Sequence, residues 1–198
     1  MTKNQQQTNS KKGTLFVVSG PSGSGKSTLC RAVLERTDAR LSISATTRQI
    51  GTGETDGQNY YFLSEQEFLD KVRAGEFLEY ARVFDYYYGT PAAPVREMLD
   101  QGLTIILEID VQGAAQVFER FPEARGILVV PPEPAELRRR LCDRGRDDTA
   151  TIEKRLAQAR REVEQAREGG CYQYTIVNGD LEKAIDEMVK LIDHDEDE

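Results

Sequence analysis

The segment Gly20–Ser27 combines residue types and a spacing that suit phosphate binding. It is Gly-Pro-Ser-Gly-Ser-Gly-Lys-Ser and matches the pattern GxxxxGK[ST] in full. Glycines let successive backbone N–H groups converge on one phosphate, Lys26 can reach the β- and γ-phosphates, and the Ser27 hydroxyl can ligate Mg²⁺. We therefore expect a nucleoside triphosphate here. The predicted ATP contacts are Gly20, Pro21, Ser22, Gly23, Ser24, Gly25, Lys26, Ser27 and Thr28.

The segments that flank this loop predict how it is positioned. The apolar, β-branched run Thr14–Ser19 stops at Gly20 and indicates a buried strand, and Lys26 to about Thr37 has helical spacing of its apolar residues. Further buried strands are predicted at Leu103–Asp110, Gly126–Val130 and Tyr174–Val177, each followed by helix-like sequence. This order predicts an α/β protein, a P-loop three-layer fold with a mostly parallel central sheet and helices on both faces.

A stretch of different character, residues 41–90, is rich in Gly, Thr and Tyr and is predicted to form an inserted lobe. Ser64 and Glu67 have the spacing of a capping box at the start of a helix that ends near Gly75. The other elements predicted in the lobe are a half-exposed strand at Leu41–Ala45, a strand at Tyr60–Leu63, a strand at Phe77–Val83, an aromatic cluster at Tyr86–Tyr88, and a helix start with Thr90 as N-cap and Pro91 as first residue.

The predicted organisation is therefore a single core with one insertion. The ranges are a disordered leader at 1–12, a core at 13–40 and 91–192 with a helical lid at about 133–157, the lobe at 41–90, and an acidic tail at 193–198. The lid region opens at Pro131–Pro134 and carries several arginines, and a later helix has an apolar stripe from Ile152 to Val163.

Composition excludes several classes of function. The net charge of −8 disfavours a nucleic-acid partner, and no apolar run is long enough to cross a membrane, so a cytoplasmic location is the default. The only histidine, His194, lies in the acidic tail, which nearly excludes histidine-based catalysis. Cys30, Cys142 and Cys171 lack metal-ligand spacing and are interpreted as free thiols. The sequence leaves the oligomeric state open.

Beyond the phosphate loop, the chain resembles the guanylate kinase family from about Leu15 to near the C-terminus. The segments that carry the resemblance are Ser42–Arg48, Gly53–Glu54, Gly57 with Tyr60, Phe77–Glu79, Tyr87–Thr90 and Leu107–Gly113. The resemblance implies Mg²⁺-dependent transfer of the terminal phosphoryl group of ATP to GMP, or to dGMP, with the acceptor bound in the lobe.

Guanine presents two adjacent donors, N1–H and the exocyclic amine, which a single carboxylate can accept together. Glu79 is the candidate for this role, although the same residue alone would equally suit an exposed strand position. The resemblance places the GMP contacts at Ser44, Arg48, Tyr60, Glu79, Tyr88, Gly89, Thr90 and Asp110. Gly51 stands where these kinases commonly have a second phosphate-binding arginine, which predicts weaker GMP binding.

The resemblance also implies which residues serve phosphoryl transfer. The predicted catalytic residues are Lys26, Arg48, Arg140, Arg144 and Arg155, of which the last three belong to the lid. Ser27 would ligate Mg²⁺, and Glu108 and Asp110 would hold the ion through water. Asn178 lies in a family motif near the ATP base.

Two alternatives remain open on the sequence. One is a related P-loop kinase for another small phosphate acceptor, such as a relative of ribose bisphosphate kinases. The other is a guanylate-kinase-like module that binds phosphopeptides without catalysis. The complete phosphate loop disfavours the second alternative, and Glu79 with Tyr60 and Thr90 disfavours the first.

Overall fold

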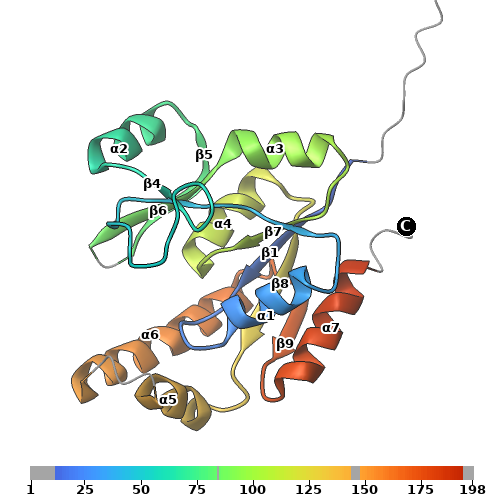
Figure 1. Ribbon diagram of the computed structural model, residues 1–198. Coiled ribbons are helices and arrows are strands. Elements are labelled where there is room, and N and C mark those ends of the chain that lie inside the picture. Colours follow the sequence, from blue (N-terminus) through green and yellow to red (C-terminus); the bar gives the residue numbers. More distant parts are fainter. Residues whose placement is uncertain (1–11, 84, 144–147, 194–198) are drawn as a thin grey trace, which may run out of the picture.

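The computed structural model describes residues 12–83, 85–143 and 148–193. Within these ranges the chain forms two sheets flanked by helices (Figure 1). The strands are β1 Leu15–Ser19, β2 Arg40–Leu41, β3 Ala45–Thr46, β4 Tyr61–Phe62, β5 Phe77–Val83, β6 Tyr86–Pro91, β7 Ile105–Glu108, β8 Arg125–Val130 and β9 Tyr174–Val177. The helices are α1 Lys26–Leu34, α2 Glu65–Arg73, α3 Ala92–Asp100, α4 Val111–Arg120, α5 Pro134–Asp143, α6 Thr149–Glu168 and α7 Leu181–Asp193.

The central sheet has the strand order β2-β7-β1-β8-β9, and all of its pairings are parallel. Successive residues of β1 face opposite sides, so both faces of the sheet need a cover. Phe16 and Val18 pack with α1 and α7, whereas Leu15 and Val17 pack with α3 and α4. Figure 1 shows these helix pairs on opposite sides of the central strands. The predicted α/β fold class is confirmed.

The carboxyl ends of the parallel strands position the chemistry of this fold. β1 lies between β7 and β8 in the sheet, and it leads directly into the loop that starts at Gly20. In open α/β sheets, ligands bind outside the carboxyl ends of the strands, at the point where the strand order reverses, as it does beside β1. The topology therefore directs a ligand to the segment between β1 and α1.

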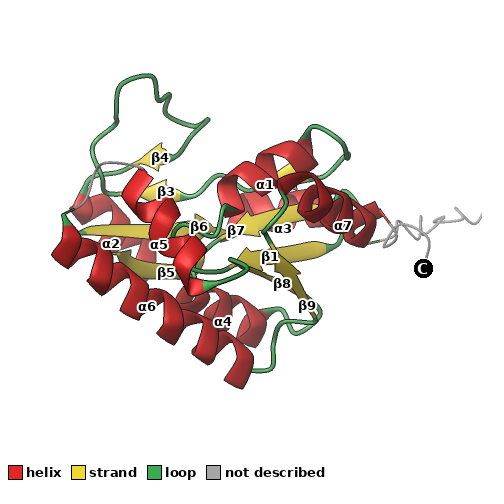
Figure 2. Cartoon of the chain, turned by 90° about the horizontal axis from the view of Figure 1, so that it is seen from below, coloured by secondary structure: helices red, strands yellow, loops and turns green. Residues whose placement is uncertain are grey.

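The second sheet belongs to the predicted lobe and has the order β4-β3-β6-β5. Its core contains Phe68, which stacks on Phe77 and Tyr87 at centroid distances of 4.5 and 5.5 Å. The capping box of α2 is confirmed, because the Ser64 hydroxyl accepts from the Glu67 N–H and the Glu67 carboxylate accepts from the Ser64 N–H. Figure 2 shows this sheet at the end of the molecule opposite α7.

Two predictions for the lobe are wrong. The expected strand Leu41–Ala45 is divided, because Arg40–Leu41 pairs with β7 in the central sheet whereas Ala45–Thr46 pairs with β6 in the second. Alternation of side chains cannot tell which sheet a strand joins. Thr90 is not the N-cap of α3; it lies in β6 opposite Glu79, and Pro91 is the N-cap.

The predicted lid region contains α5 and the start of α6. Leu137 and Leu141 of α5 pack against Ile152 and Leu156 of α6 in a small core of their own. The Asp148 carboxylate caps α6 by accepting from the Thr151 N–H at 2.7 Å. Residues 1–11 of the predicted leader 1–12, and residues 194–198 of the predicted acidic tail 193–198 with His194 among them, lie outside the described residues.

Candidate functional site

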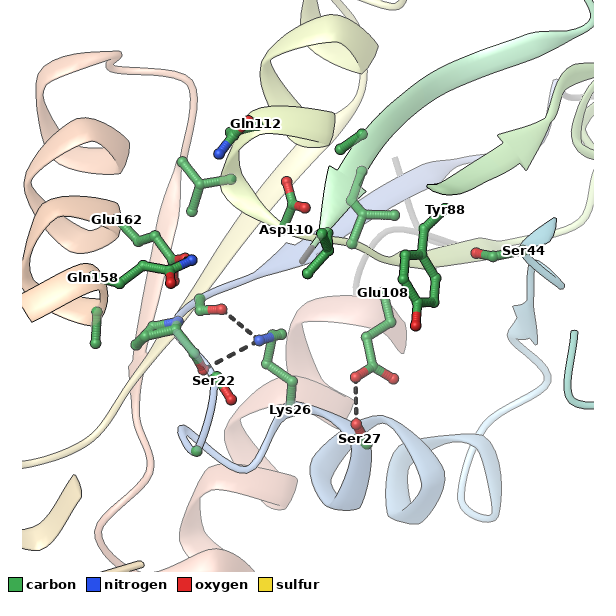
Figure 3. A pocket seen from close by; sticks show the side chains of 18 of the residues that line it. Ser22, Lys26, Ser27, Ser44, Tyr88, Glu108, Asp110, Gln112, Gln158 and Glu162 are labelled. Carbon is green, nitrogen blue, oxygen red and sulfur yellow. Dashed lines mark hydrogen bonds between the residues drawn. The ribbon is translucent and has the colours of Figure 1, made fainter. Parts of the chain in front are cut away.

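A cavity of about 540 Å³ opens between the phosphate loop, the end of β7, the lobe and α6. Figure 3 shows Lys26 and Ser27 on its loop side, Tyr88 and Ser44 on its lobe side, and Gln158 and Glu162 on α6. One cavity thus joins the segment predicted to bind a triphosphate to the segment predicted to bind an acceptor.

The phosphate loop has backbone conformations that only glycine adopts readily. Gly20 and Gly25 have φ values of 146° and 92°, and a Cβ at Gly20 would lie 2.0 Å from the carbonyl oxygen of Val129. The Lys26 ammonium donates to the carbonyl oxygens of Gly20 and Pro21, the latter at 3.2 Å. Burial lowers the pKa of Lys26, and the nearby Glu108 carboxylate opposes that shift.

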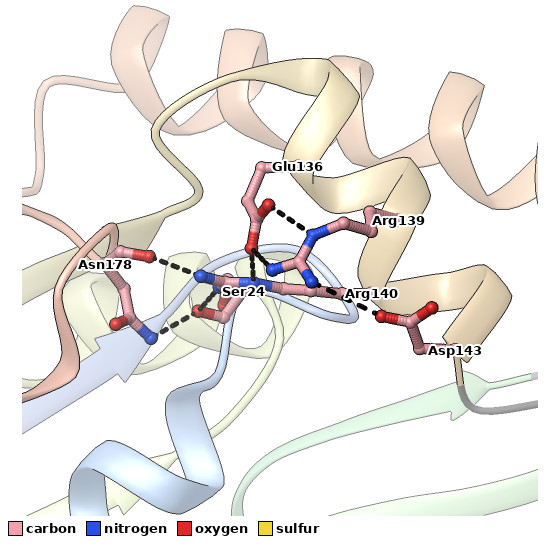
Figure 4. A network of polar contacts seen from close by, with 6 residues as sticks. All are labelled: Ser24, Glu136, Arg139, Arg140, Asp143 and Asn178. Atoms are coloured by element: carbon pink, nitrogen blue, oxygen red, sulfur yellow. Dashed lines mark hydrogen bonds and ion pairs between the residues drawn. The ribbon is translucent and has the colours of Figure 1, made fainter.

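The outer side of the loop is anchored through the carbonyl oxygen of Ser24 (Figure 4). The buried Asn178 side chain donates to it at 2.8 Å, and Arg140 of α5 donates to it at 3.3 Å and to the Asn178 carbonyl at 2.8 Å. Arg140 also pairs with Glu136. Hydrogen bonds from Arg139 and Arg140 lower the pKa of Glu136 to about 2. These contacts join α5 and the end of β9 to the loop.

Glu79 is the buried carboxylate of the lobe. It is 4% exposed, and its Oε1 accepts from the Thr90 hydroxyl at 2.7 Å. Burial raises the pKa of Glu79 to about 7, an effect that the Thr90 hydrogen bond opposes and the charge of Asp110 reinforces. A buried carboxylate with access to a cavity is well suited to accept from a ligand's paired donors.

Arg48 lies at the rim of the lobe and pairs with Glu54. Its two terminal nitrogens are 2.9 and 2.7 Å from the two Glu54 oxygens, and this hydrogen bonding raises the pKa of Arg48. The guanidinium also lies 5.6 Å from the ring centre of Tyr60, which in turn makes an edge-to-face contact with Tyr88 at 6.0 Å. Arg48 does not line the cavity, whereas both tyrosines do.

The donor set beside the loop fits Mg²⁺, which prefers hard oxygen ligands and keeps several waters. The Ser27 hydroxyl and the Glu108 carboxylate are hydrogen-bonded to each other, so both oxygens already face one point (Figure 3). Asp110 is less available than expected: it does not end the strand but caps α4, where its Oδ1 accepts from the Gly113 N–H at 2.8 Å. The described residues contain no cluster of three or more metal-ligating side chains.

Most of the predicted site residues line the one cavity. The lining includes Gly20, Pro21, Ser22, Gly23, Gly25, Lys26, Ser27, Thr28, Ser44, Tyr60, Glu79, Tyr88, Gly89, Glu108, Asp110 and Arg155. Four predicted residues do not line it: Ser24 and Arg140 lie at the anchor, Thr90 lies behind Glu79, and Arg48 pairs with Glu54. Arg144 lies outside the described residues.

The structure adds lining residues that sequence reasoning missed. Gln158 and Glu162 stand three and seven positions after Arg155 on α6, and all three side chains face the cavity. Burial raises the pKa of Glu162. The signal was present in the sequence, because polar residues at helical spacing run beside the apolar stripe of this helix.

A parallel α/β core with a complete phosphate loop, facing a second lobe across a shared cavity, defines a P-loop protein that can bring a nucleoside triphosphate and an acceptor together. The guanylate kinase family profile matches residues 12–195. The chain therefore belongs to the guanylate kinase family, as its sequence motifs predict.

Individual relatives agree with this assignment. A guanylate kinase of Synechocystis sp. is 48% identical over 186 residues, covering 93% of this chain and 96% of the relative. A guanylate kinase of Caldanaerobacter subterraneus subsp. tengcongensis is 45% identical over 183 residues, covering 92% and 87%. The crystal structure of guanylate kinase from Anaplasma phagocytophilum superposes with a TM-score of 0.76 at 33% identity, covering 93% of this chain and 87% of that one.

Proposed function

We propose that this protein transfers the γ-phosphoryl group of ATP to GMP. The observation that carries the proposal is that the phosphate loop and the buried Glu79 carboxylate line the same cavity. Glu79 in its ionised form accepts from N1–H and the exocyclic amine of guanine, whereas adenine presents an acceptor at N1. An AMP in this position would leave buried polar groups unpaired, which disfavours it by about a hundredfold or more.

The transfer itself requires alignment and positive charge. The loop N–H groups and Lys26 hold the β- and γ-phosphates, and Arg155 faces the cavity from α6. Lys26 first exchanges its hydrogen bonds to the loop carbonyls for phosphate oxygens. The GMP phosphate is itself an anionic nucleophile, so no side chain is assigned as a general base.

The acceptor phosphate is held at the lobe end of the cavity. Tyr60 and Tyr88 offer hydroxyl donors there, and Arg48 supplies a bidentate cation once it releases Glu54. Ser27 and Glu108 would hold Mg²⁺, which would supply positive charge to the triphosphate. Arg140, through its hydrogen bonds to Ser24 and Asn178, keeps the loop in shape.

A coupled assay with Mg-ATP and the acceptors GMP, dGMP, AMP, CMP and UMP tests the proposal. We expect turnover with GMP to exceed that with AMP, CMP or UMP by about a hundredfold. Turnover of none of these nucleotides would favour another phosphate acceptor, and binding of GMP without turnover would favour a non-catalytic binding module. The substrates would be ATP and GMP, which are intracellular metabolites, so we further propose a cytoplasmic location, testable by cell fractionation.

A further inference from the structure

We propose that Gly113 is a specificity-determining positioning residue, because its lack of a side chain lets the Glu79 carboxylate lie against the first turn of α4, where guanine is read. The inference rests on the proposed function and extends it to a residue that does not touch the substrate. It follows from how closely helix α4 and strand β5 are joined.

One face of α4 holds the backbone of β5 on both sides of Glu79. Gln116 donates to the Tyr80 carbonyl at 2.8 Å and accepts from the Tyr80 N–H at 3.3 Å. Arg120 donates to the Phe77 carbonyl at 2.6 Å. Gly113, Gln116 and Arg120 are spaced by three and four residues and therefore share this face. The strand cannot move away from the helix at Glu79 without breaking these bonds.

The space between Gly113 and Glu79 is too small for a methyl group. A Cβ at Gly113 would lie 2.4 Å from Oε2 of Glu79, 3.0 Å from its Cδ and 3.4 Å from its Cγ. The nearest atoms that such a Cβ meets all belong to Glu79, so the glutamate side chain is the part that must shift. Its other oxygen, Oε1, is held by Thr90 at 2.7 Å. A shift of Oε2 therefore breaks this hydrogen bond or turns the carboxylate away from its two acceptor directions.

This geometry separates folding from recognition. Alanine forms helices more readily than glycine, so Gly113→Ala should leave α4 intact. The carboxylate must meet both N1–H and the exocyclic amine of guanine at hydrogen-bond distance, and a displaced carboxylate loses at least one of them. IMP lacks the exocyclic amine, so it has fewer hydrogen bonds to lose when the carboxylate is displaced. The variant should therefore be impaired with GMP more than with IMP.

The first experiment measures kcat and KM of the full chain for GMP, IMP and ATP. For Gly113→Ala we expect the KM for GMP to rise about tenfold, the KM for ATP to change by less than about twofold, and the GMP preference over IMP to fall about threefold or more. Gly169→Ala is the matched control, because Gly169 has helical φ and ψ of −67° and −19° at the end of α6 and does not line the cavity. It should leave all three values unchanged.

A double-mutant cycle tests whether the effect passes through Glu79. Glu79→Asp withdraws the carboxylate from Gly113 by one methylene, so adding Gly113→Ala to that variant should raise the KM for GMP much less than it does in the wild type. An equal rise in both backgrounds would overturn the inference, as would an unchanged GMP preference over IMP or a Gly113→Ala chain that does not fold. If the wild type itself fails to phosphorylate GMP, the proposed function fails, and the role of Gly113 in reading guanine fails with it.

Discussion

Replacing Glu79 by glutamine should stabilise the protein above pH 7 while impairing its use of GMP. The Glu79 carboxyl is 4% exposed, and burial raises its pKa from the ordinary 4.5 to about 7. Each unit of this shift corresponds to about 1.4 kcal/mol, so ionising the folded protein at Glu79 costs about 3 kcal/mol relative to the unfolded chain. The variant Glu79→Gln cannot ionise, and its amide oxygen can still accept from the Thr90 hydroxyl.

The sign and the pH window follow from the direction of the shift. Because the folded pKa is raised, the contribution of Glu79 to stability is fully present below about pH 4.5 and is lost as the pH rises through 7. Urea unfolding at a series of pH values measures the difference between Glu79→Gln and the wild type. That difference should grow in favour of the variant between pH 4.5 and 7 and then reach a plateau of up to about 3 kcal/mol.

Glu119→Gln, at an exposed position of α4, is the control and should show no such rise. In the same preparations kcat/KM for GMP should fall about a hundredfold in Glu79→Gln, because an amide N–H₂ group would face the donors of guanine. A difference in unfolding free energy that is flat across this pH range would refute the raised pKa of the buried Glu79.

Three further substitutions test separate parts of the structure. Asn178→Ala removes the 2.8 Å bond to the Ser24 carbonyl and should raise the KM for ATP about tenfold with little change for GMP; equal changes for both nucleotides would contradict the anchor. Gly51→Arg should lower the KM for GMP about tenfold and Gly51→Gln should not, because the charge makes the phosphate contact; no fall with arginine would count against the role of Gly51. Phe68→Ala should reduce the free energy of unfolding by about 3 to 5 kcal/mol in urea titrations, and a loss under 1 kcal/mol would show that the lobe core tolerates the cavity.

From the sequence alone we could predict those features of the protein that depend on residues close together in the chain. The phosphate loop is specified within eight positions, because glycines at Gly20 and Gly25 allow the required backbone turns and Lys26 follows them directly. The capping box of α2 and the buried strands of the central sheet are similarly local, since hydrogen bonds and side-chain periodicity within a few residues define them.

The proposed role of Glu79 in reading guanine could not be inferred from the local sequence pattern alone. Alone, its residue type suited an exposed strand equally well, and only the order of motifs along the chain favoured the site. In the structure, Glu79 is buried against α4 and accepts a hydrogen bond from Thr90. The alternation of residues within β5 could not indicate either feature.

The tertiary structure determines which segments meet. It divided the strand at Leu41–Ala45 between two sheets, paired Arg48 with Glu54, and placed Arg140 and Asn178 on the phosphate loop more than 100 residues away in sequence. It also places Gly113 so close to Glu79 that a methyl group on Gly113 would clash with the Glu79 carboxylate. Such contacts depend on the packing of whole helices and sheets against one another, which the spacing of residues within a single element does not encode.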